Sequence, residues 1–250
     1  MKITVLKQIL FVCIFYILVS CSHGDAVSPD SSSTGVGGSM ARLTINGNTL
    51  IAATTNSELK AFTIGNNGVP VQSSVVAVNA TVETIFPYNN YVLLGTETGM
   101  FAYEVSDNGK LTYISNVEHI RSCDPVAAQN NFAYITLNGL GTRCGSSSSM
   151  LQIYDISSIT KPKLIKEYAM DNPFGVGIDG NLLFVCDNGL AVYDVQDKSN
   201  IQKLMHHYIA AWDVIPYKNI LIVTGETGIH QYSYNLNDKS LELLSSIKTN

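Results

Sequence analysis

Five positions in this chain are equivalent, because each lies seven residues before an asparagine that opens an apolar run. Their side chains could together bind a ligand. These positions are Ala41, Glu83, Asp124, Phe174 and Trp212. Carboxylates bind sugar hydroxyls or a metal cation, and aromatic rings stack on sugars. Arg42 and Asp213 are their immediate neighbours. If the fold gathers these positions, the sequence predicts a carbohydrate or cation site.

Two chemistries are open to this set. A pair of carboxylates such as Glu83 and Asp124, facing each other across a cleft, could hydrolyse a glycosidic bond. The competing interpretation is that both acids cap turns or are solvated, and that Trp212 packs inside the protein. The chain contains no nucleophile elbow, phosphate loop, HExxH or dinucleotide fingerprint. We therefore expect a binding protein without catalytic residues, cofactor or metal, and keep a glycan-active enzyme as the alternative.

A fivefold internal repeat must position these residues. The repeat asparagines are Asn48, Asn90, Asn131, Asn181 and Asn219. They are 42, 41, 50 and 38 residues apart, close to the ~40–45 residues of a four-stranded propeller blade. Each copy consists of short runs rich in Val, Ile, Tyr and Phe, without a helical stripe. The pattern predicts an all-β fold, most simply a five-bladed β-propeller over residues 41–250.

A second column of aromatic residues accompanies the repeat. Its members are Phe62, Tyr103, Tyr154, Tyr193 and Tyr232, and we interpret them as packing residues. The expected blades cover residues 41–82, 83–122, 123–172, 173–211 and 212–250. Closure of the ring would rest on packing between the first and fifth blades. An open stack of five sheets, or a larger ring made by association, is the alternative.

The repeat segments resemble the LVIVD-repeat propellers of bacterial lipoproteins and secreted proteins. The resemblance lies in LLFVCDNGLAVYDV (182–195) and LQIYDIS (151–157). The region from SCDPV (122–126) to GTRCG (141–145) is similar to one that recurs in such lipoproteins. The resemblance implies the propeller fold and an envelope location, and it implies little about activity.

The first 20 residues have the form of an export signal. Lys2 and Lys7 precede an apolar run, Ile9–Val19, that is too short to span a bilayer. The sequence LVSC (18–21) resembles the lipobox of bacterial lipoproteins, which implies that Cys21 is lipidated and becomes the mature N-terminus. Residues 22–40 are rich in Ser, Gly and Pro and predict a flexible tether.

Three further cysteines enter the exported domain. Cys123 would lie between the last strand of one blade and the first of the next, and Cys144 between a second and a third strand. Both connections emerge on the same face of a propeller, so we predict a Cys123–Cys144 disulfide, contributing roughly 3 kcal/mol. Zinc is a weak alternative, because neither a C-x-x-C motif nor a matched histidine pair accompanies them. Cys186 is expected to be a small core residue.

These features together predict a lipid-anchored, non-catalytic propeller of the bacterial envelope, with the outer membrane favoured over the inner one. It would bind an envelope protein or a glycan through one face. No nucleic-acid partner is expected, because the net charge of −5 provides no basic surface for phosphates.

The lipid anchor can be tested by mass. We expect the mature chain purified from membranes to begin at Cys21 and to carry the added mass of acyl chains. A mature chain that begins at an unmodified residue would reject the anchor.

Overall fold

The computed structural model describes residues 38–118, 125–139, 148–235, 237–238 and 240–249, and this part of the chain is all-β. Contacts divide the chain into two units, residues 1–30 and 31–250. The first unit, which includes the expected signal and Cys21, lies outside the described residues.

Twenty strands form five antiparallel four-stranded sheets, each with its strands in sequence order. The first sheet contains β1 (Leu43–Asn46), β2 (Thr49–Ala53), β3 (Glu58–Ile64) and β4 (Pro70–Ala77). The second contains β5 (Val82–Tyr88), β6 (Tyr91–Thr96), β7 (Gly99–Val105) and β8 (Leu111–Glu118). The third contains β9 (Val126–Gln129), β10 (Phe132–Leu137), β11 (Met150–Asp155) and β12 (Lys163–Ala169).

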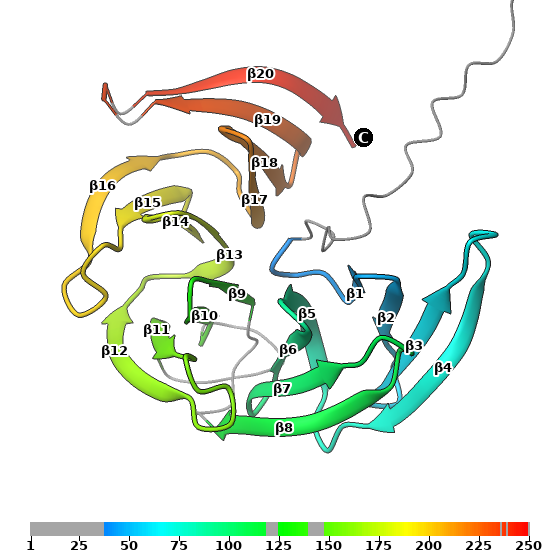
Figure 1. Ribbon diagram of the computed structural model, residues 1–250. Helices are drawn as coiled ribbons and strands as arrows, with labels where there is room; N and C mark the ends of the chain where they lie inside the picture. The colour runs from blue at the N-terminus through cyan, green and yellow to red at the C-terminus, as the bar shows by residue number, and fades with distance from the viewer. Residues whose placement is uncertain (1–37, 119–124, 140–147, 236, 239, 250) are drawn as a thin grey trace, which may run out of the picture. The chain divides into compact units, whose positions relative to one another are not determined.

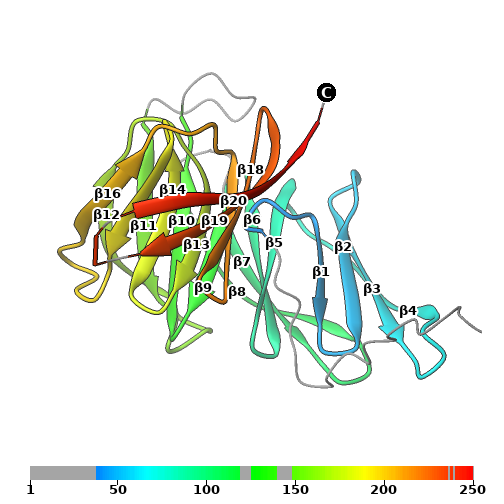
Figure 2. The same ribbon diagram turned by 90° about the horizontal axis from the view of Figure 1, so that it is seen from above.

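The fourth sheet contains β13 (Pro173–Asp179), β14 (Leu182–Asp187), β15 (Leu190–Asp194) and β16 (Gln202–His207). The fifth contains β17 (Asp213–Tyr217), β18 (Ile220–Gly225), β19 (Gly228–Asn235) and β20 (Ser240–Lys248). Figure 2 shows β1 to β4 running side by side in this order. The expected four strands per repeat are confirmed.

The repeat asparagine belongs to the tight turn between the first and second strands of each sheet. Both turn residues have positive φ at Asn130–Asn131 and at Lys218–Asn219, as a type I′ hairpin requires. The carbonyl of the asparagine then accepts the backbone N–H that ends the third strand, for example from Val105 to Asn90. At Asn131 and Asn219 the repeat asparagine itself adopts positive φ, whereas in the other three turns the residue before it does so: Gly47, Asn89 and Gly180.

The aromatic column marks a β-bulge that is present in all five sheets. In each sheet the register between the third and fourth strands shifts immediately before the aromatic residue, from Ala61/Phe62 in the first to Gln231/Tyr232 in the fifth. A bulge adds twist to a strand pair. The aromatic residues thus accompany a repeated distortion of the outer strands as well as the packing expected of them.

Successive sheets pack face to face around a common centre. The first strands of neighbouring sheets are in contact from β1 through β5, β9 and β13 to β17, and they lie innermost in Figure 1. Four apolar cores fill the spaces between consecutive sheets. Aliphatic residues of the second strands, such as Leu94, Ile135 and Val185, are fully buried in them.

The described residues form no fifth core between the fifth sheet and the first. No strand of β1–β4 packs extensively against β17–β20, and Leu43 and Ile247 on the two sheets are 54% and 67% exposed. The expected packing between the first and fifth blades is therefore not observed. The five sheets are still arranged radially, with four packed junctions among the described residues.

A hydrogen-bonded segment at the centre takes the place of that interface. The Ser39 hydroxyl donates to Asp213 Oδ1 at 2.8 Å and accepts the backbone N–H of Val176 at 2.8 Å. The backbone N–H of Met40 donates to Asp213 Oδ2 at 3.2 Å. The carbonyl of Ala41 accepts the N–H of Ile85 at 2.7 Å. Residues 39–41, which we call the clasp, thus join the second, fourth and fifth sheets.

Two glycines make room for the Asp213 carboxylate in the clasp. A Cβ atom at Gly38 would come within 2.1 Å of Asp213 Oδ2, and one at Gly175 within 2.2 Å of Oδ1. The carboxylate is buried, and this burial raises its pKa, although donors from Ser39, Met40 and Val214 act in the opposite direction.

We predict that Asp213→Ala destabilises the protein by roughly 2 kcal/mol at neutral pH, because three donors lose their acceptor.

The raised pKa means that folded Asp213 holds its proton more strongly than the unfolded chain does. The free energy of unfolding of the wild type should therefore fall as pH rises from about 4, and this contribution should be absent in the variant. Urea unfolding between pH 4 and 8 measures both effects. Asp107→Ala, at an exposed carboxylate, is the control. Equal stability of wild type and Asp213→Ala at every pH would contradict the clasp.

Candidate functional site

Two of the residues expected to bind a ligand, Asp213 and Arg42, make hydrogen bonds within the protein. Asp213 is held by the clasp. The guanidinium of Arg42 donates from Nη2 to the carbonyl of Val82 at 2.7 Å, which fixes the entry into β5. Glu83, half-buried, is the unpaired residue of a register shift between Val82 and Thr84.

The two aromatic residues of the predicted set lie close together, Phe174 in β13 and Trp212 immediately before β17. The N–H of Gly175, next to Phe174, donates to the carbonyl of Trp212 at 2.8 Å. Phe174 is half-buried and packs against the core between the fourth and fifth sheets, whereas Trp212 is 51% exposed. Asp124 lies outside the described residues, so the carboxylate pair with Glu83 stays a prediction, as does ligand binding by the whole set.

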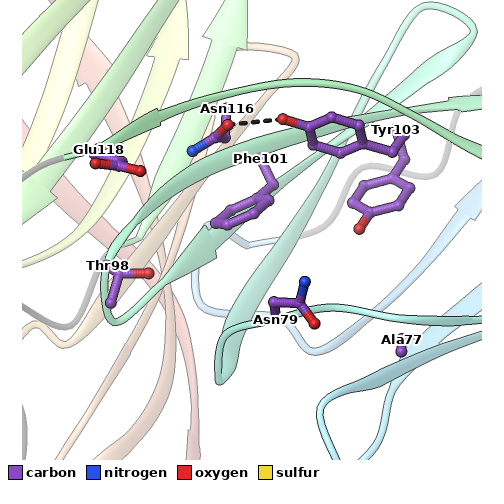
Figure 3. Close-up of a pocket in the computed structure, with 8 residues that line it drawn as sticks. Ala77, Asn79, Thr98, Phe101, Tyr103, Asn116 and Glu118 are labelled. Atoms are coloured by element: carbon purple, nitrogen blue, oxygen red, sulfur yellow. Dashed lines mark hydrogen bonds between the residues drawn. The ribbon is translucent and has the colours of Figure 1, made fainter.

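A different site is visible between the outer strands of the first and second sheets. A hollow of about 790 Å³ opens there. Three of its lining residues are aromatic (Phe101, Tyr103 and Tyr113), and the others are Ala77, Asn79, Thr98, Asn116 and Glu118. Figure 3 shows the rings of Phe101 and Tyr103 on one side and the amide of Asn79 opposite them.

Strand register explains why so many side chains of the second sheet face this hollow. Phe101 lies opposite Asn116, and Tyr103 lies opposite Tyr113. The bulge between Ala102 and Tyr103 leaves one residue of β8 unpaired. Tyr113 and Asn116 therefore share a face although they are three positions apart, whereas a regular strand places such residues on opposite faces.

Ring packing and one short hydrogen bond hold the wall of the hollow. The ring of Tyr113 packs edge-on against Tyr103, with centroids 5.7 Å apart, and lies 6.5 Å from that of Phe101. The Tyr113 hydroxyl donates to Asn116 Oδ1 at 2.7 Å, which is the dashed line in Figure 3. The Asn116 amide nitrogen is thereby oriented as a donor. Burial, and then the neighbouring Tyr113, raise the pKa of Tyr103, so this phenol stays protonated at neutral pH.

Hydrogen bonds between the first and second sheets close one end of the hollow. Near the turn between β7 and β8, Ser73 donates to the carbonyl of Gly109 at 3.1 Å, and the N–H of Leu111 donates to the Ser74 hydroxyl at 3.3 Å. The other end is lined by Asn79, from the connection between β4 and β5, and by Thr98, from the turn between β6 and β7. These connections belong to the face on which the sequence analysis expected binding.

This site is not among those predicted from the sequence, in which Tyr103 was expected only as a packing residue. Tyr103 is indeed 5% exposed and part of the core between the first two sheets. The available signal was Tyr113, an aromatic residue in an outer strand whose neighbours are polar. No pattern in the sequence reveals that the outer strands of the first two sheets diverge here.

Other sequence expectations have mixed outcomes. Cys186 is confirmed as a buried core residue, and burial, followed by the charge of Asp213, raises the pKa of its thiol. Cys123 and Cys144 lie outside the described residues. Within the described ranges, no cluster of three or more His, Cys, Asp and Glu side chains could hold a metal ion. The same part of the chain contains no helix that is long and apolar enough to cross a bilayer.

Comparison with known proteins gives matches in structure but not in sequence. No family model and no curated protein matches the chain. A Lactobacillus plantarum protein is 14% identical, with a TM-score of 0.63, over 80% of this chain and 68% of its own length. The periplasmic gluconolactonase of Pseudomonas aeruginosa is 13% identical, with a TM-score of 0.61, over 81% and 68%. BamB from Moraxella catarrhalis is 12% identical, with a TM-score of 0.51, over 80% and 58%.

The radial packing of five meandering sheets and the likeness to these β-propellers decide the fold. The chain is a β-propeller. At these identities the likeness shows the fold alone, so the function must be argued from the residues of this propeller.

The two tyrosines of the hollow should differ in their effect on stability. Tyr103→Ala removes a buried ring, and we expect it to lower the free energy of unfolding by about 3 kcal/mol. Tyr113 is 50% exposed, so Tyr113→Ala should cost about 1 kcal/mol or less. Urea unfolding measures both. Equal losses would show that Tyr113 is a core residue and not a wall of an open hollow.

Proposed function

We propose that this propeller is a lipid-anchored, non-catalytic protein of the bacterial envelope that binds a glycan in the hollow between its first and second sheets. The observation that supports a glycan as the ligand is the lining of the hollow, in which three aromatic rings accompany the amides of Asn79 and Asn116. Aromatic faces pack on the C–H surfaces of sugar rings, while amides donate to and accept from hydroxyls.

The chemistry of the hollow favours a neutral or cationic sugar over a polyanion. Among the described residues that line it, the one charged side chain is Glu118, which is exposed. A carboxylate accepts hydrogen bonds from hydroxyl or amino groups and repels phosphate. The net charge of −5 acts in the same direction.

Binding fits this geometry better than hydrolysis does. Glycoside hydrolysis commonly needs two carboxyl groups on opposite sides of the bond, and the described lining of the hollow supplies one, Glu118. Glu83 and Asp124 remain the alternative pair, as predicted from the sequence. An enzyme of that kind would lose turnover, with its fold intact, when both are replaced by alanine.

The envelope location rests on the sequence of the N-terminus. The short apolar run and LVSC (18–21) support export and lipidation of Cys21. The resemblance to LVIVD-repeat lipoproteins points to the same location. The outer membrane is favoured over the inner membrane, and an envelope protein is the other partner to be considered.

We predict that Tyr113→Ala weakens glycan binding at least tenfold, which corresponds to about 1.4 kcal/mol, because a sugar ring loses its stacking surface. A glycan array that includes peptidoglycan fragments and neutral polysaccharides would identify a ligand, and isothermal titration with it would give the affinity. Tyr208→Ala is the matched control, because Tyr208 is 89% exposed and outside the hollow.

Other outcomes would place the binding site elsewhere or contradict it. Binding that survives Tyr113→Ala but is lost in Trp212→Ala would move the site to the centre, among the residues predicted from the sequence. Binding that is equally weakened by Tyr208→Ala would indicate a nonspecific surface effect and would contradict the hollow.

A further inference from the structure

Asn116 and Glu118 place a hydrogen-bond donor and an acceptor side by side on one face of β8. The two residues are two positions apart in the strand, so their side chains share a face, and both line the hollow. Within the described residues, the only hydrogen bond of the Asn116 side chain is the one that its Oδ1 accepts from Tyr113, and the Glu118 side chain makes none. A ligand in the hollow can therefore bond to both.

The hydroxyl of Tyr113 determines which end of the Asn116 amide faces a ligand. Because Oδ1 accepts the hydroxyl proton at 2.7 Å, the amide nitrogen points the other way. Figure 3 shows this nitrogen on the side of Glu118, away from the dashed line. Asn116 thus presents N–H donors to the hollow, and Glu118 presents only acceptors when it is ionised.

An aromatic ring and a residue without a side chain lie beside this donor and acceptor. Phe101 of β7 lies opposite Asn116, and Gly99 lies opposite Glu118. The ring of Tyr113 is a second aromatic surface, with its centroid 6.5 Å from that of Phe101. One ring can hold the face of a sugar, and the other can hold a small apolar group attached to that sugar.

The spacing of the donor and the acceptor favours an amide group in the ligand. Side chains two positions apart along a strand are attached about 7 Å from each other. At that spacing a hydroxyl group reaches one of the two, whereas a secondary amide reaches both. Its N–H donates to the Glu118 carboxylate, and its C=O, on the opposite edge, accepts from the Asn116 nitrogen, at ~2.9 Å each. An ammonium group would pair with Glu118 alone and would face the Asn116 donors with like polarity.

We infer that the hollow recognises a sugar that carries an acetamido group. The amide lies between Asn116 and Glu118, its methyl group packs on Phe101, and the sugar ring stacks on Tyr113. This inference rests on the proposed function, because it names the class of sugar that the same site selects. Tyr113 acts twice, as a stacking surface through its ring and as a positioning residue for Asn116 through its hydroxyl.

Three oligosaccharides that differ only at the second carbon of each sugar ring test the inference. Cellotetraose carries a hydroxyl there, and the matching tetrasaccharides of glucosamine and N-acetylglucosamine carry an amino and an acetamido group. Isothermal titration into the full-length protein, purified from membranes in detergent, should show at least tenfold tighter binding of the acetylated sugar than of either other sugar, which is about 1.4 kcal/mol. Binding of cellotetraose and the acetylated sugar with equal affinity would overturn the inference and leave the proposed function intact.

Replacing the donor should invert the preference. Asn116→Asp puts a second carboxylate beside Glu118, so the acetylated tetrasaccharide should bind at least tenfold more weakly and the glucosamine tetrasaccharide more tightly. Asn67→Asp is the matched control, because it adds the same charge at an exposed residue between β3 and β4, outside the lining of the hollow. The same inversion in both variants would indicate an effect of net charge and would overturn the role of Asn116.

Tyr113→Phe separates positioning from stacking. The ring stays, but the hydroxyl that holds Asn116 is lost, so the ratio of the affinities for the acetylated sugar and cellotetraose should fall toward one. A purely structural role of the hydroxyl would weaken both sugars alike and leave the ratio at its wild-type value. That result would overturn the positioning of Asn116 by Tyr113.

Failure of the proposed function itself would give a different result. Absence of binding by all three sugars and by every other glycan on the array would overturn both the proposed function and the inference. An alanine tetrapeptide presents amides without a sugar ring. If it binds while no acetylated sugar does, the hollow takes peptides, and both are again overturned.

Discussion

The buried carboxylate of Asp213 is the interaction on which this propeller depends. It receives the hydroxyl of Ser39 and the backbone N–H groups of Met40 and Val214, all within 3.2 Å. Burial of a carboxylate is costly unless donors surround it, and here those donors come partly from the start of the domain. The hydrogen bonds that the Asp213 carboxylate accepts thus attach the clasp to the fifth sheet. Gly38 and Gly175 leave space for the carboxylate oxygens.

The clasp accounts for how five sheets hold together with four cores. A closed ring of five would have a core at every junction, as the four observed junctions do. At the fifth junction, hydrogen bonds at the centre replace apolar packing, and the outer parts of the two sheets remain apart. Hydrogen bonds fix the inner ends without burying the sheet faces. Within the described residues, the facing sides of the first and fifth sheets are therefore left without a shared core.

The hollow between the first and second sheets arises from the same radial geometry. Sheets that pack at their inner strands diverge toward their outer strands, and β4 is hydrogen-bonded to the second sheet at one end, where Ser73 and Ser74 contact Gly109 and Leu111. The bulge before Tyr103 then turns Tyr113 and Asn116 onto the same face. The bulge, a repeated feature of packing, thus places rings on one side of the hollow, while Ala77 of the first sheet and Asn79 of the connection after it line another part.

The sequence by itself determined the repeat, the strands and the buried second strands, because these depend on local patterns: alternation, turn residues such as Asn131, and aromatic residues every ~40 positions. It also placed Cys186 in the core. Tertiary structure alone decided how the first and fifth sheets meet and where a cavity forms. Asp213 illustrates the difference, since its position suggested a ligand site, whereas its partners Ser39 and Met40 are more than 170 residues away. Such contacts depend on the angles between sheets, which accumulate over the whole domain and leave no local pattern.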